Sequence, residues 1–102
     1  MNADVEQKQS AVADLCRQFH VERLYLFGSA TRQEFDPARS DLDFVVAFQP
    51  LPTGPYADAY FGLAHALEDL FHRRVDLVTE RSIRNPYFKE EVEETRQLLY
   101  AA

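Results

Sequence analysis

The sequence is poor in the residues that build disulfide-linked or zinc-stabilised domains. It has a single cysteine, Cys16, so no disulfide can form within the chain and no cysteine-based zinc site is possible. His20, His65 and His72 lie far apart in the sequence and match no metal-ligand spacing. We therefore expect Cys16 in the core and the histidines at helix ends or on the surface.

Long apolar segments are also missing. No run approaches the roughly 18 residues that a helix needs to span a bilayer. The first residues, MNADVEQKQS, lack the hydrophobic stretch of a secretory signal. These two absences favour a cytoplasmic protein that does not act at a membrane.

Basic residues are outnumbered. Eleven Lys and Arg face 17 Asp and Glu, a net charge of −6, and Arg73 and Arg74 form the only adjacent basic pair. A protein that grips a phosphate backbone usually shows a basic stripe, so direct nucleic-acid binding is not expected. A small anionic ligand that arrives with metal ions remains compatible with this charge.

The hydrophobic pattern predicts one α/β (α+β) domain over residues 1–102, with helices packed against a mixed sheet of three to four strands. We find no repeats. The tail at 97–101 fits either a short edge strand or an extended end. The predicted helices span residues 4–19, 56–71 and 85–95, and the predicted strands span 21–27, 41–48 and 73–80.

A Gly28-Ser29 turn follows the first predicted strand. Backbone N–H groups at such a turn, ahead of a short helix, can hold a phosphate, and Gly28 would let the ligand approach the backbone closely. The same pair could simply end the strand, because Gly-Ser turns are common.

Asp41 and Asp43 stand two residues apart in DLDFVVAF. Alternate strand residues share a face, roughly 6–7 Å apart, and two carboxylates there repel each other by about 2–3 kcal/mol. A divalent cation reverses the sign, and Mg²⁺ favours one or two carboxylates plus substrate phosphates. The other interpretation is that Asp41 caps a turn and Asp43 is a solvated strand end.

Asp76 interrupts the third apolar strand, VDLV. If this strand neighbours the one that carries Asp43, three carboxylates converge, as two-metal phosphoryl or nucleotidyl transfer requires. Otherwise Asp76 is an edge-strand residue paired with Arg73 or Arg74.

Gly28-Ser29, eleven further residues, Asp41-x-Asp43 and a later Asp76 together resemble the nucleotidyltransferase fold of the DNA polymerase beta superfamily. Within this superfamily, the chain resembles the minimal nucleotidyltransferases in its length and in the segments LFGSATR and SDLDFVVAF. The resemblance implies that Asp41 and Asp43 bind two Mg²⁺ ions, and that Asp76 helps to bind metal and activates the acceptor hydroxyl.

The resemblance also implies phosphate-binding roles. It assigns the triphosphate of ATP to Gly28 and Ser29, with Arg32 and Ser40 as further contacts. Gln33 stands where the family often has glycine, which is a departure from the pattern.

Minimal nucleotidyltransferases are commonly paired with a HEPN ribonuclease toxin, so the resemblance implies an antitoxin that transfers AMP from ATP to a tyrosine of such a partner. One alternative is an antitoxin that neutralises its partner by binding alone. Another is transfer to a small molecule or an RNA end, which the shortage of basic residues and the missing acceptor domain disfavour.

Overall fold

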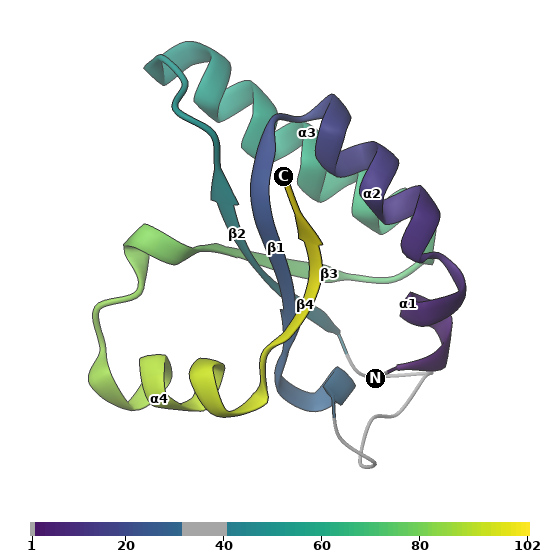
Figure 1. Ribbon diagram of the computed structural model, residues 1–102, viewed down its shortest axis with the longest axis vertical. Helices are drawn as coiled ribbons and strands as arrows, with labels where there is room; N and C mark the ends of the chain where they lie inside the picture. Colours follow the sequence, from purple (N-terminus) through teal and green to yellow (C-terminus); the bar gives the residue numbers. More distant parts are fainter. Residues whose placement is uncertain (1, 32–40) are drawn as a thin grey trace.

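A four-stranded mixed sheet forms the centre of the molecule (Figure 1). The computed structural model describes residues 2–31 and 41–102. The strand order is β3-β2-β1-β4; β2 runs parallel to β3, and β1 runs antiparallel to both β2 and β4. The strands are β1 (Val21–Phe27), β2 (Leu42–Phe48), β3 (Val75–Thr79) and β4 (Gln97–Ala101).

Helices lie on both sides of this sheet. In Figure 1, α2 and α3 run side by side along one face, whereas α4 lies across the other. The predicted fold class is confirmed, and the tail is the edge strand β4. The helices are α1 (Ala3–Gln7), α2 (Gln9–Gln18), α3 (Thr53–Phe71) and α4 (Pro86–Thr95), with short 3₁₀ turns η1 (Gly28–Thr31) and η2 (Glu80–Ser82).

The first predicted helix is in fact two helices. The break falls at Lys8, whose φ of −101° and ψ of 14° leave the helical region. The Lys8 ammonium donates a hydrogen bond of 3.1 Å to the carbonyl of Leu70, near the end of α3. This contact joins residues 62 positions apart, so the local hydrophobic pattern of the sequence could not predict it.

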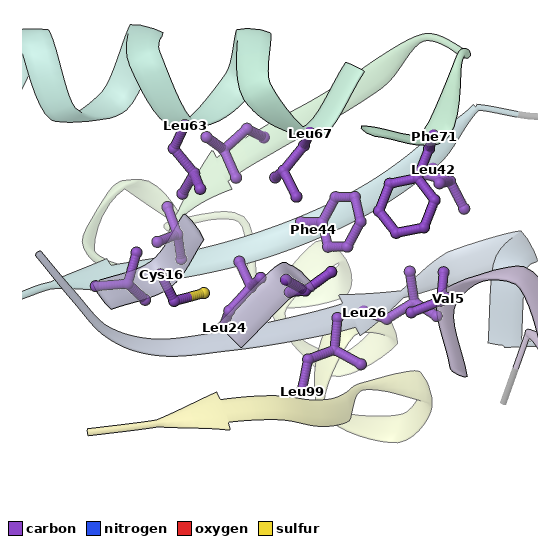
Figure 2. Close-up of a cluster of buried hydrophobic side chains, with 14 residues drawn as sticks. Val5, Cys16, Leu24, Leu26, Leu42, Phe44, Leu63, Leu67, Phe71 and Leu99 are labelled. Carbon is purple, nitrogen blue, oxygen red and sulfur yellow. The ribbon is translucent and has the colours of Figure 1, made fainter. Parts of the chain in front are cut away.

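The main core lies between the sheet and helices α1 to α3. Figure 2 shows side chains of α3 meeting those of β2, with Cys16 and Val5 entering from the N-terminal helices. Alternate residues of β2 point into this cluster, as predicted for an apolar strand face. Its fully or almost fully buried members are Val5, Val12, Cys16, Val21, Leu24, Leu26, Leu42, Phe44, Val46, Leu63, Leu67, Phe71, Leu77 and Leu99.

A smaller apolar cluster holds α4 against the opposite face. Phe27, Val45 and Val92 are its buried members. The rings of Phe27 and Phe88 meet edge to face, with centroids 5.7 Å apart. Because Val45 alternates with core-facing neighbours, α4 covers the face of the sheet that points away from α2 and α3.

The start of α4 follows its sequence signals. Asn85 accepts hydrogen bonds from the backbone N–H groups of Tyr87 and Phe88, at 2.9 and 3.3 Å, and Pro86 is the first helical residue. His20, His65 and His72 are exposed, as expected. Within residues 2–31 and 41–102, no helix combines the length and the apolar character needed to cross a membrane.

Candidate active site

Two of the three predicted aspartates lie opposite each other on neighbouring strands. Asp43 of β2 pairs with Asp76 of β3 in the parallel register. Their flanking residues, such as Leu42 and Leu77, are buried in the main core, so both carboxylates lie on the face that α4 covers. Neighbouring strands are about 4.8 Å apart, which places the two carboxylates side by side.

Asp41 comes immediately before this pair. The β2–β3 ladder begins at Leu42, whose N–H donates to the carbonyl of Arg74 at 3.1 Å. Asp41 is partly buried and lies one residue outside the strand. It is therefore at the same end of the sheet as Asp43 and Asp76, and β3 is the neighbour of β2, as the prediction of a shared site supposed.

The Gly28 turn passes directly over Asp43. Phe27 pairs with Asp43 across the antiparallel ladder, and Gly28 follows with a φ of +74°. A Cβ at Gly28 would lie 2.8 Å from Oδ2 of Asp43. Glycine is needed here for two reasons, the positive φ and the close approach of the turn to the carboxylate.

Like charges gather around Asp43. The pKa of Asp43 is raised from 3.8 to about 6, first by burial and then by the charges of Asp76, Asp41 and Glu91. Among the ion pairs between described residues, none includes Asp41, Asp43 or Asp76. The pairing of Asp76 with Arg74 that the sequence left open is absent from these ion pairs.

The described residues do not form a complete metal-binding site by themselves. Among residues 2–31 and 41–102, no three His, Cys, Asp or Glu side chains are placed so that they could hold an ion by themselves. The donor set nevertheless fits Mg²⁺, since hard carboxylate oxygens with no ion-pair partner among the described residues lie on one face of the sheet. Mg²⁺ sites of nucleotide enzymes are usually completed by substrate phosphates, so a protein-only cage is not required.

The predicted phosphate contacts are described in part. Gly28 and the backbone of Ser29 lie in η1, directly after β1. Thr31 closes this turn by donating from its hydroxyl to the carbonyl of Gly28 at 2.7 Å. Arg32 and Ser40 lie outside the described residues.

Helix α4 contributes two residues that the sequence did not single out. Thr95 Oγ1 accepts a hydrogen bond of 3.1 Å from the N–H of Gly28. Glu91, one turn earlier, adds its charge to those that raise the pKa of Asp43. The acidic run KEEVEETR resembles an ordinary solvated helix face, so only the packing of α4 could reveal them.

The aromatic residues near the proline-rich loop lie elsewhere. Tyr56 packs edge to face on Phe48, at the far end of β2 from Asp41, with centroids 5.2 Å apart. Phe61, in contrast, is 62% exposed. The sequence left Tyr56, Tyr60 and Phe61 open between core residues and rings that stack on a nucleobase or a partner. Tyr60 packs against the main core, whereas Tyr56 is only half-buried and Phe61 is exposed.

The order and placement of these groups agree with the comparisons. The family described as "Nucleotidyltransferase domain" matches residues 9–99. The chain belongs to this nucleotidyltransferase family. It is an enzyme family, and the resemblance seen in the sequence motifs is confirmed.

Individual members of the nucleotidyltransferase family agree in sequence and in fold. A Methanocaldococcus jannaschii protein named "Putative protein adenylyltransferase" is 38% identical over 76 residues, 74% of each chain. A solved "putative minimal nucleotidyltransferase" is 34% identical with a TM-score of 0.75, over 91% of this chain and 90% of that one. A toxin–antitoxin structure with AMP-PNP is 26% identical with a TM-score of 0.67, over 92% and 73%.

Proposed function

We propose that this nucleotidyltransferase is the antitoxin of a toxin–antitoxin pair and transfers AMP from ATP to a tyrosine hydroxyl of a HEPN-type toxin in the cytoplasm. The observation that carries the proposal is the pairing of Asp43 with Asp76 beneath the Gly28 turn. Support for the nucleotide and the partner comes from the related toxin–antitoxin structure that holds AMP-PNP.

The proposed chemistry divides among the described residues. Asp41 and Asp43 would hold Mg²⁺, with Asp76 as a further ligand. When bound, Mg²⁺ supplies positive charge that polarises the α-phosphate and stabilises the pyrophosphate leaving group. The turn at Gly28 and Ser29 would hold the triphosphate through backbone N–H groups.

The transfer step needs a base for the acceptor hydroxyl. Asp76 is exposed at the edge of the sheet, where an incoming side chain can reach it. In the proposed reaction the hydroxyl oxygen attacks the α-phosphorus, its proton passes to Asp76, and the bond from the α-phosphorus to pyrophosphate breaks. AMP is then joined to the acceptor through a phosphodiester.

Labelling of the partner tests this proposal. The chain would be mixed with ATP labelled at the α-phosphate, Mg²⁺ and the protein encoded by the adjacent reading frame. We expect label and one or more AMP masses on the partner, and loss of both in Asp41→Asn/Asp43→Asn. The matched control, Asp58→Asn/Asp69→Asn, removes two exposed carboxylates of α3 and should label normally.

The same variants separate catalysis from binding. An Asp41→Asn/Asp43→Asn chain that still labels its partner would contradict the proposed site. One that fails to label, yet still protects cells from the toxin, would show that the antitoxin works by binding alone. Loss of both labelling and protection is the result that the proposal predicts.

A further inference from the structure

The hydroxyl of Thr95 makes two hydrogen bonds that connect α4 to the phosphate turn. It donates to the carbonyl of Glu91 at 2.9 Å and accepts from the N–H of Gly28 at 3.1 Å. A hydroxyl has one proton, and here that proton is committed to the helix. The directions of its two lone pairs are therefore fixed, and one of them accepts from Gly28.

This contact joins the start of the phosphate turn to the end of α4. Gly28 N–H is the first backbone donor after β1, and Thr95 is the last residue of α4. The carboxylate of Asp43 lies where a side chain of the same glycine would stand. The turn is thus fixed from α4 by a hydrogen bond and bounded from β2 by a close contact.

The contact also removes one donor from the phosphate turn. Because the N–H of Gly28 already donates to Thr95, the donors left for a triphosphate are those that follow it in η1. Gly28 then serves through its positive φ and its lack of a side chain, which set the direction of the N–H groups after it.

We propose that Thr95 is a positioning residue of the active site: its hydroxyl holds Gly28 so that the next N–H groups of η1 face the triphosphate of ATP. This inference rests on the proposed function, because it assumes that the turn binds a nucleotide. It adds a residue from α4 to a site otherwise built from the ends of three strands.

Thr95→Val tests the inference, because valine has nearly the same shape and no hydroxyl. Affinity for AMP-PNP with Mg²⁺ would be measured by calorimetry, and KM for ATP and for the acceptor protein by labelling. We expect the affinity to fall and KM for ATP to rise by up to about fivefold, because the nucleotide would then have to order a turn that has lost one of its hydrogen bonds. KM for the acceptor should stay within twofold.

Two further variants serve as controls for Thr95→Val. Thr95→Ser keeps the hydroxyl and should recover most of the affinity. Hydrogen exchange at the Gly28 amide should be slow in the wild type and in Thr95→Ser, and faster in Thr95→Val. Thr53→Val makes the same substitution at an exposed residue of α3 and should leave the affinity for AMP-PNP unchanged.

The outcomes separate the two proposals. If Thr95→Val binds AMP-PNP as tightly as the wild type, or more tightly because Gly28 N–H becomes free for the phosphate, this inference is wrong and the proposed function stands. If kcat falls while KM for ATP and the affinity for AMP-PNP are unchanged, Thr95 does not position the turn for ATP binding and this inference is wrong. If the wild-type chain does not bind AMP-PNP, the proposed function and this inference fail together.

Discussion

Asp43 and Asp76 occupy paired positions on the two parallel strands, with Oδ2 of Asp43 turned toward the Gly28 turn. Two acidic residues at this place weaken the fold, because Asp43 is partly buried and lies beside the like charge of Asp76. Such an arrangement is expected where a bound ligand, rather than the fold, selects the residues.

The first prediction concerns the pH dependence of stability. The pKa of Asp43 is about 6 in the folded chain and 3.8 is its ordinary value, so the folded state binds the proton more tightly. Ionisation of Asp43 therefore destabilises the fold progressively from about pH 4 to about pH 6, and fully above that. Asp43→Asn should be more stable than wild type by about 1–2 kcal/mol at about pH 7.5, after allowance for solvent screening.

Urea unfolding with a metal chelator present checks this. The difference between Asp43→Asn and wild type should shrink toward zero as the pH falls to about 4, where the native carboxyl is protonated. The exposed Asp58→Asn should show no such pH-dependent difference. A gap of constant size from pH 4 to 8 would contradict the assignment of the shift to Asp43.

The second prediction is that Mg²⁺ offsets this repulsion. Mg²⁺ at ten times its dissociation constant should stabilise the wild type by about 1.4 kcal/mol, which raises Tm by about 4–8 °C per kcal/mol for a domain of this size. Asp41→Asn/Asp43→Asn should show little or no rise, whereas Asp58→Asn/Asp69→Asn should respond as the wild type does. Equal shifts in all three chains, measured by calorimetry with and without chelator, would mean that Mg²⁺ binds elsewhere.

The strands of this fold could be predicted from sequence because the pattern of apolar residues within each strand is local to that strand. β1 has the predicted bounds, and β2 starts one residue late. The neighbouring positions of β2 and β3 could only be supposed, since periodicity describes each strand alone. Asp43 beside Asp76 thus follows from topology, although both residues stand out in the sequence as charges in apolar strands.

Contacts between distant segments account for what could not be predicted. The side chain of Lys8, at the helix break, donates to the carbonyl of Leu70, and the N–H of Gly28 in the phosphate turn donates to Thr95, 67 residues later. Neither Lys8 nor Thr95 stands out from the residues around it in the sequence. A lysine in an amphipathic helix and a threonine in an acidic helix carry no signal until the helices are packed.

The third prediction concerns the anchoring of β3, the edge strand that carries Asp76. The Tyr60 hydroxyl of α3 donates to the carbonyl of Leu77, next to Asp76. Burial, and then the charge of Asp76, raises the pKa of this phenol. Tyr60→Phe leaves that carbonyl without its side-chain donor and should cost about 1 kcal/mol in the free energy of unfolding.

Tyr87→Phe is the matched control for this substitution. Tyr87 is 82% exposed, so the loss of its hydroxyl should change stability by less than about 0.5 kcal/mol. Both variants would be compared with the wild type by urea unfolding followed by circular dichroism. If the two substitutions cost the same, the Tyr60 hydroxyl does not contribute to holding β3.

The fourth prediction concerns the close approach of Gly28 to Asp43. Gly28→Ala places a methyl group 2.8 Å from Oδ2 of Asp43 and puts a side chain on a residue with a φ of +74°. The left-handed backbone alone costs about 1–2 kcal/mol, and the displaced carboxylate should also abolish Mg²⁺-dependent nucleotide binding. Gly54→Ala in the first turn of α3, where a Cβ meets nothing within 4 Å, should be neutral or stabilising by up to about 1 kcal/mol.

A double-mutant cycle separates the backbone cost of Gly28→Ala from the contact with the carboxylate. In an Asp43→Ala background the 2.8 Å contact with Oδ2 no longer exists, so Gly28→Ala should there cost only the backbone term. The two substitutions should therefore couple by about 1 kcal/mol. Additive effects in urea unfolding would show that the carboxylate moves aside freely, and that only the φ of Gly28 requires glycine.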